Sequence, residues 1–322
     1  MMSWIDSSEP VIGMAGEGDD AALALHGRAG RRHNPWQKGI DMSRCKRVTV
    51  VVFSLCSTVV LGGSGLVNAA EQGTLDTTFG SGGKVVIPFD LVAGGSDFAR
   101  AVAVQRDGKI VVVGGAEKVG SETDFAVLRL EPDGDLDPTF GTGGKTLIPF
   151  DLGGFDLNTA VTVAIQSDGA IVVAGPVTGA DGDLDFGIAR LESDGDLDPN
   201  FGIGGMTTVA FDLGGSKDDY PRDIAIQDDG KIVVVGGGDG SLGNDDFLVA
   251  RLTSDGDRDA TFGLDGMRVV FFDLGGGNGD LAFAVAIQPT GEILLAGRVD
   301  VSIGNTDMVV VRLNSNSTND FT

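Results

Sequence analysis

Cysteine, histidine and tryptophan are nearly absent from this sequence of 322 residues, with two of each. All six precede residue 60, so the rest of the chain contains none of these residue types. Their absence excludes a Ser-His-Asp triad, a cysteine nucleophile and a typical zinc site from that part. A domain of roughly 250 residues buries enough apolar surface to fold without disulfides.

Basic residues are also scarce. From residue 70 onward the sequence has 16 Lys and Arg against 41 Asp and Glu. A surface this acidic repels the phosphates of nucleic acids and of anionic membranes. We therefore expect no nucleic-acid partner and no membrane insertion of the mature chain.

The longest apolar run is too short for a membrane span. Residues 48–61 (VTVVVFSLCSTVVL) follow a basic segment that begins at Met42, whereas a spanning helix needs roughly 20 apolar residues. Small residues come next, and Val67 and Ala69 would occupy positions −3 and −1 of a cleavage point. Residues 42–69 are therefore predicted to be a signal peptide, and the alternative is an uncleaved N-terminal anchor.

This prediction divides the chain into three parts. Residues 1–41 would be an upstream extension, which we expect to be disordered, because Met42 has the position of a true start. Residues 70–322 would be the mature protein. Cleavage would make it secreted, periplasmic or attached to the cell surface.

A repeat of 61 residues fills the mature part. The stretch GDLDPTFGTGGK (134–145) recurs with variations, and its phenylalanine returns as Phe79, Phe140, Phe201 and Phe262. A fixed period of this kind is typical of repeat architectures. Four repeats follow one another without a linker, at about 73–133, 134–194, 195–255 and 256–316.

Each repeat is predicted to contain four strands. In the first repeat they are KVVIPF (84–89), RAVAVQ (100–105), KIVVVG (109–114) and DFAVLRL (124–130). These segments are rich in β-branched residues and are bounded by turn-forming residues. Asp107-Gly108 is typical of a hairpin turn between the second and third strands. No segment has a sustained period of 3.6 residues, so the fold class is all-β.

The side-chain pattern predicts how the sheets pack. Val102 and Val104 lie on one face of the second strand and Ala103 on the other, while the third strand is apolar throughout. Sheets of this pattern are covered on both faces. Four such sheets in succession indicate a β-propeller, with an open β-arc or part of a larger ring as alternatives. The repeated phenylalanine would fill the space between consecutive blades.

The repeat resembles the delta-60 repeat, a family of bacterial repeat proteins thought to form β-propellers. The resemblance rests on four blocks that recur in order: LDPTFG.GGK, FDL, AVAVQ.DGKIVVVG and DFAVLRL.PDG. It covers about three quarters of the chain. It implies the fold and export rather than an activity.

An arginine recurs in the last strand of each repeat, at Arg129, Arg190, Arg251 and Arg312. An arginine among apolar neighbours needs a carboxylate partner. The favoured interpretation is an ion pair between blades, and the alternative is a ring of anion-binding arginines.

Aspartates at alternate positions recur in the turn after that strand, in the sequences DGDLD and DGDRD. Carboxylates so spaced can converge on calcium, which prefers six to eight oxygen ligands. The turns lack the glycine and the glutamate of an EF-hand, and aspartate and glycine also suit a simple β-turn. The candidate calcium ligands are Asp133, Asp135, Asp137, Asp194, Asp196, Asp198, Asp255, Asp257 and Asp259.

The loops that differ most between the repeats are residues 115–123, 153–159, 175–184, 214–222 and 297–306. The segment SKDDYPR contains the only tyrosine, Tyr220, with Lys217 and Arg222 beside it. These three residues are the candidate ligand-binding patch. The sequence favours a binding or scaffold module at or outside the cell envelope, with a glycan or a protein as ligand. A carboxylate-dependent polysaccharide hydrolase or lyase and a purely structural surface repeat are the alternatives.

Overall fold

The computed structural model describes residues 73–153, 158–213, 218–239, 245–272, 274, 279–302 and 304–315. The chain divides into two compact units, Met1–Val67 and Asn68–Thr322, and all described residues belong to the second. The predicted upstream extension and signal peptide lie outside the described residues. Within the described ranges, no helix is long and apolar enough to cross a membrane.

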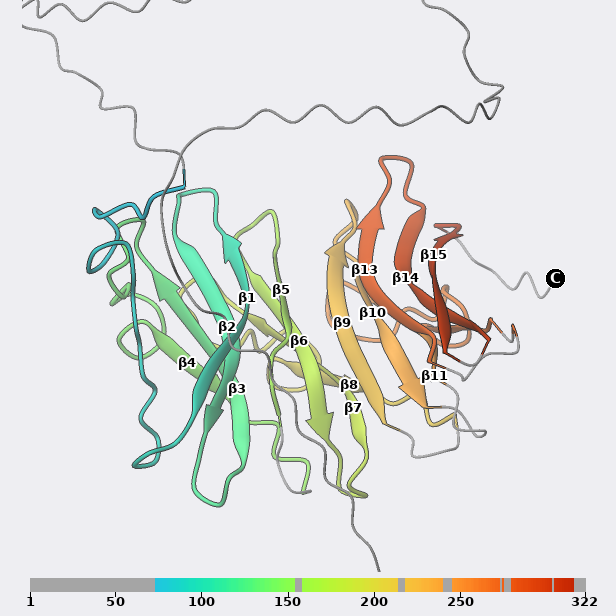
Figure 1. Cartoon of the computed structure of the whole chain (residues 1–322), viewed down its shortest axis with the longest axis horizontal. Coiled ribbons are helices and arrows are strands. Elements are labelled where there is room, and N and C mark those ends of the chain that lie inside the picture. Colours follow the sequence, from blue (N-terminus) through green and yellow to red (C-terminus); the bar gives the residue numbers. More distant parts are fainter. Residues whose placement is uncertain are drawn as a thin grey trace, which may run out of the picture. The chain divides into compact units, whose positions relative to one another are not determined.

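The described residues form four antiparallel sheets (Figure 1). The first sheet contains β1 (Asp97–Val104), β2 (Ile110–Glu117), β3 (Thr123–Leu130) and β4 (Lys145–Ile148). The second contains β5 (Thr162–Ile165), β6 (Ile171–Thr178), β7 (Leu184–Leu191) and β8 (Met206–Val209). The third contains β9 (Asp219–Ile226), β10 (Ile232–Asp239), β11 (Asp245–Leu252) and β12 (Met267–Val270). The fourth contains β13 (Leu281–Ile287), β14 (Ile293–Ser302) and β15 (Asn305–Leu313). The all-β propeller predicted from the sequence is confirmed, in its open form.

The sheets are offset from the sequence repeats by one strand. Each sheet takes three strands from one repeat, and β4, β8 and β12 come from the start of the following repeat. Residues 84–89, predicted to be the first strand of the first repeat, form no strand. The reason is that the described residues include no earlier sheet with which this segment could pair. Among the described residues, the fourth sheet has three strands for the complementary reason.

Asp-Gly hairpins join the first two strands of three sheets, as predicted. Gly108 has a φ of 90°, a left-handed conformation that glycine adopts without strain. The Asp107 carboxylate accepts a hydrogen bond of 3.1 Å from the Lys109 amide and closes the turn. In the fourth sheet Thr290-Gly291 replaces Asp-Gly and Gly291 keeps a φ of 94°.

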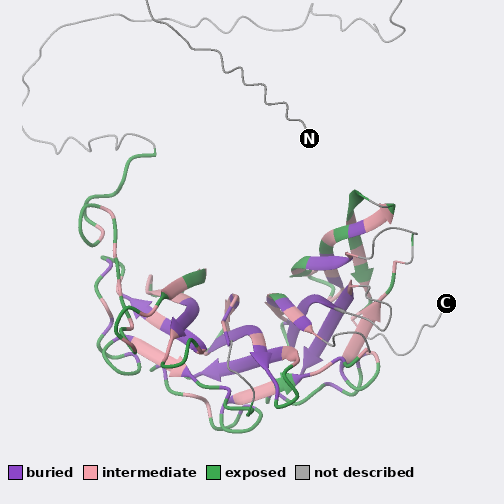
Figure 2. Cartoon of the chain, turned by 60° about the horizontal axis from the view of Figure 1, so that its bottom comes forward, coloured by how far each residue is buried: buried purple, intermediate pink, exposed green. Residues whose placement is uncertain are grey.

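We call the interface between two consecutive sheets a seam. The core of the described residues consists of three seams. One cluster of buried side chains joins the first sheet to the second, another the second to the third, and another the third to the fourth. The valine and isoleucine residues of the first strands β5, β9 and β13 face the preceding sheet, as Val163 and Ile165 do. Figure 2 shows buried segments concentrated where successive sheets face each other.

The repeated phenylalanine fills the seams, as predicted. Phe140, Phe201 and Phe262 are fully buried, one in each cluster. Aromatic pairs close the seams farther along. The Phe125 and Phe150 rings lie 4.9 Å apart, and Phe186–Phe211 and Phe247–Phe272 repeat the pair.

The sequence predicted that every sheet is covered on both faces, but the outer faces of the first and fourth sheets are exposed. Val102 and Val104 are 64% and 67% exposed, because in the described residues no sheet precedes β1. At the other end, Met308 and Val310 of β15 are exposed for the same reason. No buried cluster joins the first sheet to the fourth in the described part of the chain, so the row is not closed.

Candidate functional site at the sheet seams

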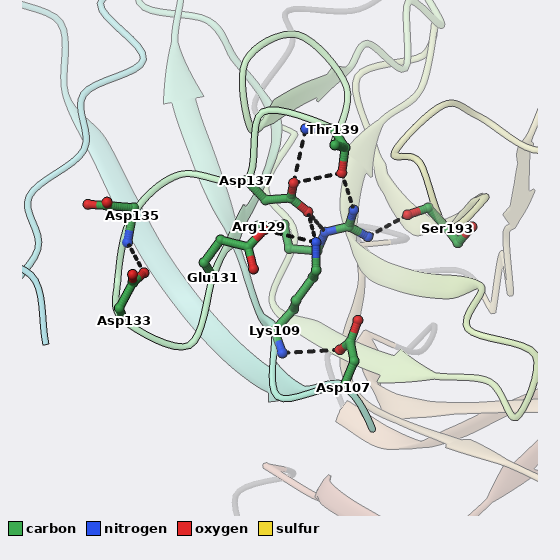
Figure 3. A network of polar contacts seen from close by, with 9 residues as sticks. All are labelled: Asp107, Lys109, Arg129, Glu131, Asp133, Asp135, Asp137, Thr139 and Ser193. Carbon is green, nitrogen blue, oxygen red and sulfur yellow. Dashed lines mark hydrogen bonds and ion pairs between the residues drawn. The ribbon is translucent and has the colours of Figure 1, made fainter.

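Each seam contains an arginine that contacts both sheets. Arg129 of β3 donates from Nε to Asp137, with a distance of 2.6 Å to Oδ2 (Figure 3). Its guanidinium carbon lies 4.6 Å from the centre of the Phe140 ring. Its Nη1 donates to the backbone carbonyl of Ser193, in the loop after β7 of the next sheet. The other two seams repeat this arrangement with Arg190, Asp198, Phe201 and Ser254, and with Arg251, Asp259, Phe262 and Ser315.

The predicted ion pair between blades is therefore wrong in its position. Arginine and aspartate belong to the same sheet, because the aspartate lies in the loop between its third and fourth strands. The contact that crosses the seam is the hydrogen bond to a backbone carbonyl. The prediction that each arginine has a carboxylate partner is confirmed at the three seams.

Hydrogen bonds keep the buried aspartate of this network ionised. Burial raises the pKa of Asp137, but donors from Lys109, Thr139 and Arg129 outweigh it and hold the pKa well below its ordinary value. Burial acts in the same direction on Asp198 and Asp259, and the hydrogen bonds and arginine of each again lower its pKa. The network is thus a permanent charge pair at neutral pH.

The predicted calcium ligands have other roles within their turns. The third aspartate of each turn is paired with the seam arginine and accepts a backbone N–H two residues later, as Asp137 does from Thr139 at 2.9 Å. Asp133 accepts the Asp135 amide at 3.2 Å, and both lie apart from Asp137 in Figure 3. Among the described side chains, no three of His, Cys, Asp or Glu are grouped to hold a metal ion. The calcium site stays a prediction.

A melting experiment distinguishes the calcium site from the alternative of a simple β-turn, which the arginine contacts favour. Because the third carboxylate of each turn is bound to arginine, we expect equal melting temperatures in millimolar Ca²⁺ and Mg²⁺. A calcium-specific rise that chelator removes would contradict this expectation. At 100 times its Kd, one bound ion would add about 2.7 kcal/mol. The Asp135→Asn variant is the control, since only a calcium site at the turn would make the rise depend on it.

A polar cleft lies at each seam, beside the Asp-Gly turns. The clefts at the first, second and third seams have volumes of about 540, 680 and 300 Å³. The first two share Arg106, Gln166, Ser167 and Asp168, and the second and third share Gln227 and Asp228. Because neighbouring clefts share walls, they continue one another from seam to seam.

Both charge signs line these clefts. Arg106, Lys109 and Arg129 face the first cleft together with Asp107, Asp168 and Asp194. Arg106 is exposed, and its Nη1 donates across the seam to the Ser167 carbonyl at 3.4 Å. The second cleft is more acidic, with two arginines against four aspartates. A lining of both donors and acceptors with this charge suits a neutral, hydroxyl-rich ligand better than an anionic one.

A glutamine at each cleft was not singled out as a site residue from the sequence, although it recurs every 61 residues. The side-chain amide of Gln105 donates to the Gly169 carbonyl of the next sheet at 3.5 Å, and Gln227 does so to Gly291. The side-chain oxygens of Gln105, Gln166 and Gln227 are buried and have no hydrogen-bond partner among the described residues. The 61-residue spacing of these glutamines is the sequence feature that could have identified them as cleft residues.

The predicted ligand-binding patch lies away from the seam clefts. Tyr220 and Arg222 belong to β9, with the Arg222 guanidinium 5.8 Å from the Tyr220 ring centre. The Tyr220 hydroxyl donates to Asp218 at 3.4 Å, and burial, with the charge of Asp218, raises its pKa. Lys217 lies outside the described residues. Phe98 and Arg100 form the corresponding pair in β1, so the patch is less distinctive than the sequence indicated.

The comparisons with known proteins agree with the fold. Residues 105–140, 166–201, 227–262 and 288–320 match a family model described as "Domain of unknown function (DUF5122) beta-propeller". This match supports a β-propeller-like repeat family. No curated protein matches the chain.

Three solved structures are distantly similar. An exo-1,5-α-L-arabinanase from a bovine ruminal metagenomic library is 13% identical, with a TM-score of 0.36, over 66% of this chain and 72% of that one. The GH43 endo-arabinanase from Bacillus licheniformis is 11% identical, with a TM-score of 0.31, over 71% and 96%. The tail fiber of Staphylococcus aureus phage P68 is 11% identical, with a TM-score of 0.25, over 70% and 51%. Similarity this weak carries no argument about function.

Proposed function

We propose that this protein is an exported binding module that holds a neutral glycan chain along its seam clefts. The observation that carries the proposal is the continuity of the clefts, which share Arg106, Gln166 and Asp168 between the first two seams and Gln227 between the next two. A site that repeats with the blades suits a ligand that is itself a repeating polymer.

The size and chemistry of the clefts support this ligand class. Volumes of about 300–1,000 Å³ are typical of small-molecule sites, and the clefts fall within that range at about 300, 540 and 680 Å³. Sugar hydroxyls both donate and accept hydrogen bonds, which matches a lining of arginine, aspartate and glutamine. The acidic charge of the mature chain disfavours polyanionic ligands.

The test begins with expression of the full chain in a bacterial host. Export predicts recovery outside the cytoplasm with Ala70 as the new N-terminus by mass spectrometry. Affinity electrophoresis through gels containing soluble xylan or dextran is then expected to retard the protein, whereas polygalacturonate, an anionic polymer, should not. Retardation by none of the neutral polymers would contradict the glycan ligand, and release of reducing ends would favour the hydrolase alternative.

Two variants locate the binding site. Arg106→Ala is expected to weaken the retardation by roughly tenfold, because it removes a charged donor shared by two clefts. Arg222→Ala removes an arginine from the patch predicted from the sequence and should leave the retardation unchanged. The opposite pattern would assign binding to the Tyr220–Arg222 patch.

A further inference from the structure

The segment Gly80–Phe89, which we call the strap, is fastened to the first sheet as if a fourth seam existed. The Gly80 amide donates to the Asp133 carbonyl at 2.7 Å. The corresponding bonds at the inner seams run from Gly141 to Asp194 at 2.6 Å and from Gly202 to Asp255 at 2.7 Å.

The other end of the strap is held in the same way. The Phe89 amide donates to the Asp97 carboxylate at 2.7 Å, and the Phe211 amide donates to Asp219 at the same distance in the third sheet. Ile87 and Phe89 also line a small cavity with Val112 and Leu128 of the first sheet. The strap therefore already has the position of a seam strand.

Among the described residues, no sheet pairs with the strap. Its counterparts β4, β8 and β12 each pair antiparallel with the last long strand of the preceding sheet. In the described part of the chain, the only β-pairing of the strap is an isolated bridge between Gly80 and Lys84. Val86, near its middle, is 92% exposed.

The fourth sheet, in contrast, has no fourth strand among the described residues. β15 pairs with β14 on one side, and no described strand pairs with its other edge. Its residues Met308 and Val310 are 96% and 70% exposed. Their counterparts Phe247 and Val249 are fully buried in the third seam. Unpaired edges with apolar side chains are sites of strand addition.

We propose that the strap of a second copy of this chain pairs with β15 and completes the fourth sheet. The repeat predicts the register. Ile148 pairs with Phe125 and Thr146 with Val127 in the first sheet, and subtraction of one repeat turns Ile148 and Thr146 into Ile87 and Val85. The second copy's Ile87 therefore lies opposite Met308, and its Val85 opposite Val310.

We assign the missing strand to a second copy because no buried cluster of the described residues joins the first sheet to the fourth, so the two ends of one chain do not cover each other. The three seams are built alike. In the single chain, Val102 and Val104 are exposed at the β1 end of the row of sheets, and Met308 and Val310 at the β15 end. A head-to-tail neighbour presents the face that each end lacks, which is a heterologous interface. Arg312, the exposed fourth member of the arginine series, would then donate to the second copy's Pro132 carbonyl, as Arg129 does to Ser193.

Cysteine cross-linking tests the pairing in full-length protein carrying Cys45→Ser and Cys56→Ser. A mixture of an Ile87→Cys chain with a Met308→Cys chain is expected to form a disulfide-linked pair on oxidation, because directly opposed residues lie 4.5–5.5 Å apart between Cα atoms. Ile87→Cys mixed with Val310→Cys, two residues out of register, should not cross-link. A doubly substituted chain that cross-links within itself, or no cross-link in the mixture, would overturn the proposal.

Light scattering gives an independent measurement that needs no cysteine. The wild-type chain is expected to have at least twice the mass of one copy at micromolar concentration. Val310→Lys should weaken association by roughly tenfold or more, because it places a charge in an apolar seam. Val119→Lys changes an equally exposed valine, in the loop after β2, and should leave the mass unchanged. A wild-type monomer, or equal effects of the two variants, would refute the second copy.

Discussion

Replacement of Arg251 by methionine is expected to lower the free energy of unfolding by about 3–5 kcal/mol, the usual cost of breaking a buried ion pair from one side. Arg251 is only 2% exposed. Its Nε lies 2.8 Å from Asp259 Oδ2, and its Nη2 donates to Thr261 at 3.2 Å. Methionine keeps most of the packing on Phe262 but leaves the Asp259 carboxylate without its cation.

The repeats supply matched controls for urea denaturation of this variant. Arg312 has the same position in the fourth repeat and is exposed in the single chain. In protein dilute enough to be a single copy, Arg312→Met should therefore change stability by less than about 0.5 kcal/mol. Adding Asp259→Asn to Arg251→Met should recover part of the loss, because the amide keeps the acceptor for the Thr261 N–H without a buried charge. If the double variant is no more stable than Arg251→Met, the loss comes from packing on Phe262 rather than from charge.

Replacement of Asp219 by asparagine is expected to stabilise the protein above pH 7. Asp219 is 2% exposed, and burial, together with the nearby carboxylates Asp185, Asp212 and Asp218, raises its pKa to about 7 although the Phe211 amide opposes this. A pKa raised from 3.8 penalises the ionised form in the folded state. The stability that the protonated group contributes is present in acid and is lost as the pH rises through 7.

The expected gain for Asp219→Asn is about 2–4 kcal/mol at pH 8 and close to zero at pH 4. The chain already tolerates this change, because Asn158 has the same position in the second sheet and its Oδ1 accepts the Thr178 amide at 3.0 Å. Thermal melts from pH 4 to 8 measure the effect. Asp97→Asn, at the corresponding but only partly buried position of the first sheet, should give a smaller gain. Equal gains at pH 4 and pH 8 would show that charge is not the cause.

Asp219 also bears on the question of catalysis. A buried carboxyl with a raised pKa is a candidate general acid. Here the position recurs as Asp97, Asn158 and Asp280, and each side chain accepts a backbone N–H near a strand end. A residue that asparagine replaces in one blade and that holds backbone in all four is better explained by structure than by chemistry.

The sequence alone predicted the fold to the level of the individual blade. Residues such as Val163 and Ile165 alternate with small ones along each strand, and the glycine of each hairpin turn has positive φ, so local pattern and local geometry agree. Because the pattern recurs every 61 residues, the same blade was predicted in each of the four repeats. The buried phenylalanine of each seam followed from the same repetition.

Site residues were predicted less well, because contacts in this fold cross from one repeat to the next. Asp137 was assigned to calcium, whereas folding places Arg129 and Lys109 within 2.6 and 2.7 Å of its carboxylate. Gln105 contacts Gly169, which is 64 residues later in the chain. This separation is longer than one repeat, so no pattern within a single repeat could predict the contact.

Which strands form a sheet was decided only by tertiary structure. The segments 84–89 and 145–150 are near-identical in sequence (KVVIPF and KTLIPF), yet only the second forms a strand, β4. A strand requires a partner for its backbone hydrogen bonds, and propensity cannot supply one. Repetition in the sequence thus determined the blade and its core. The sheet that precedes or follows each blade determined which of its faces are buried and which edges remain available to another chain.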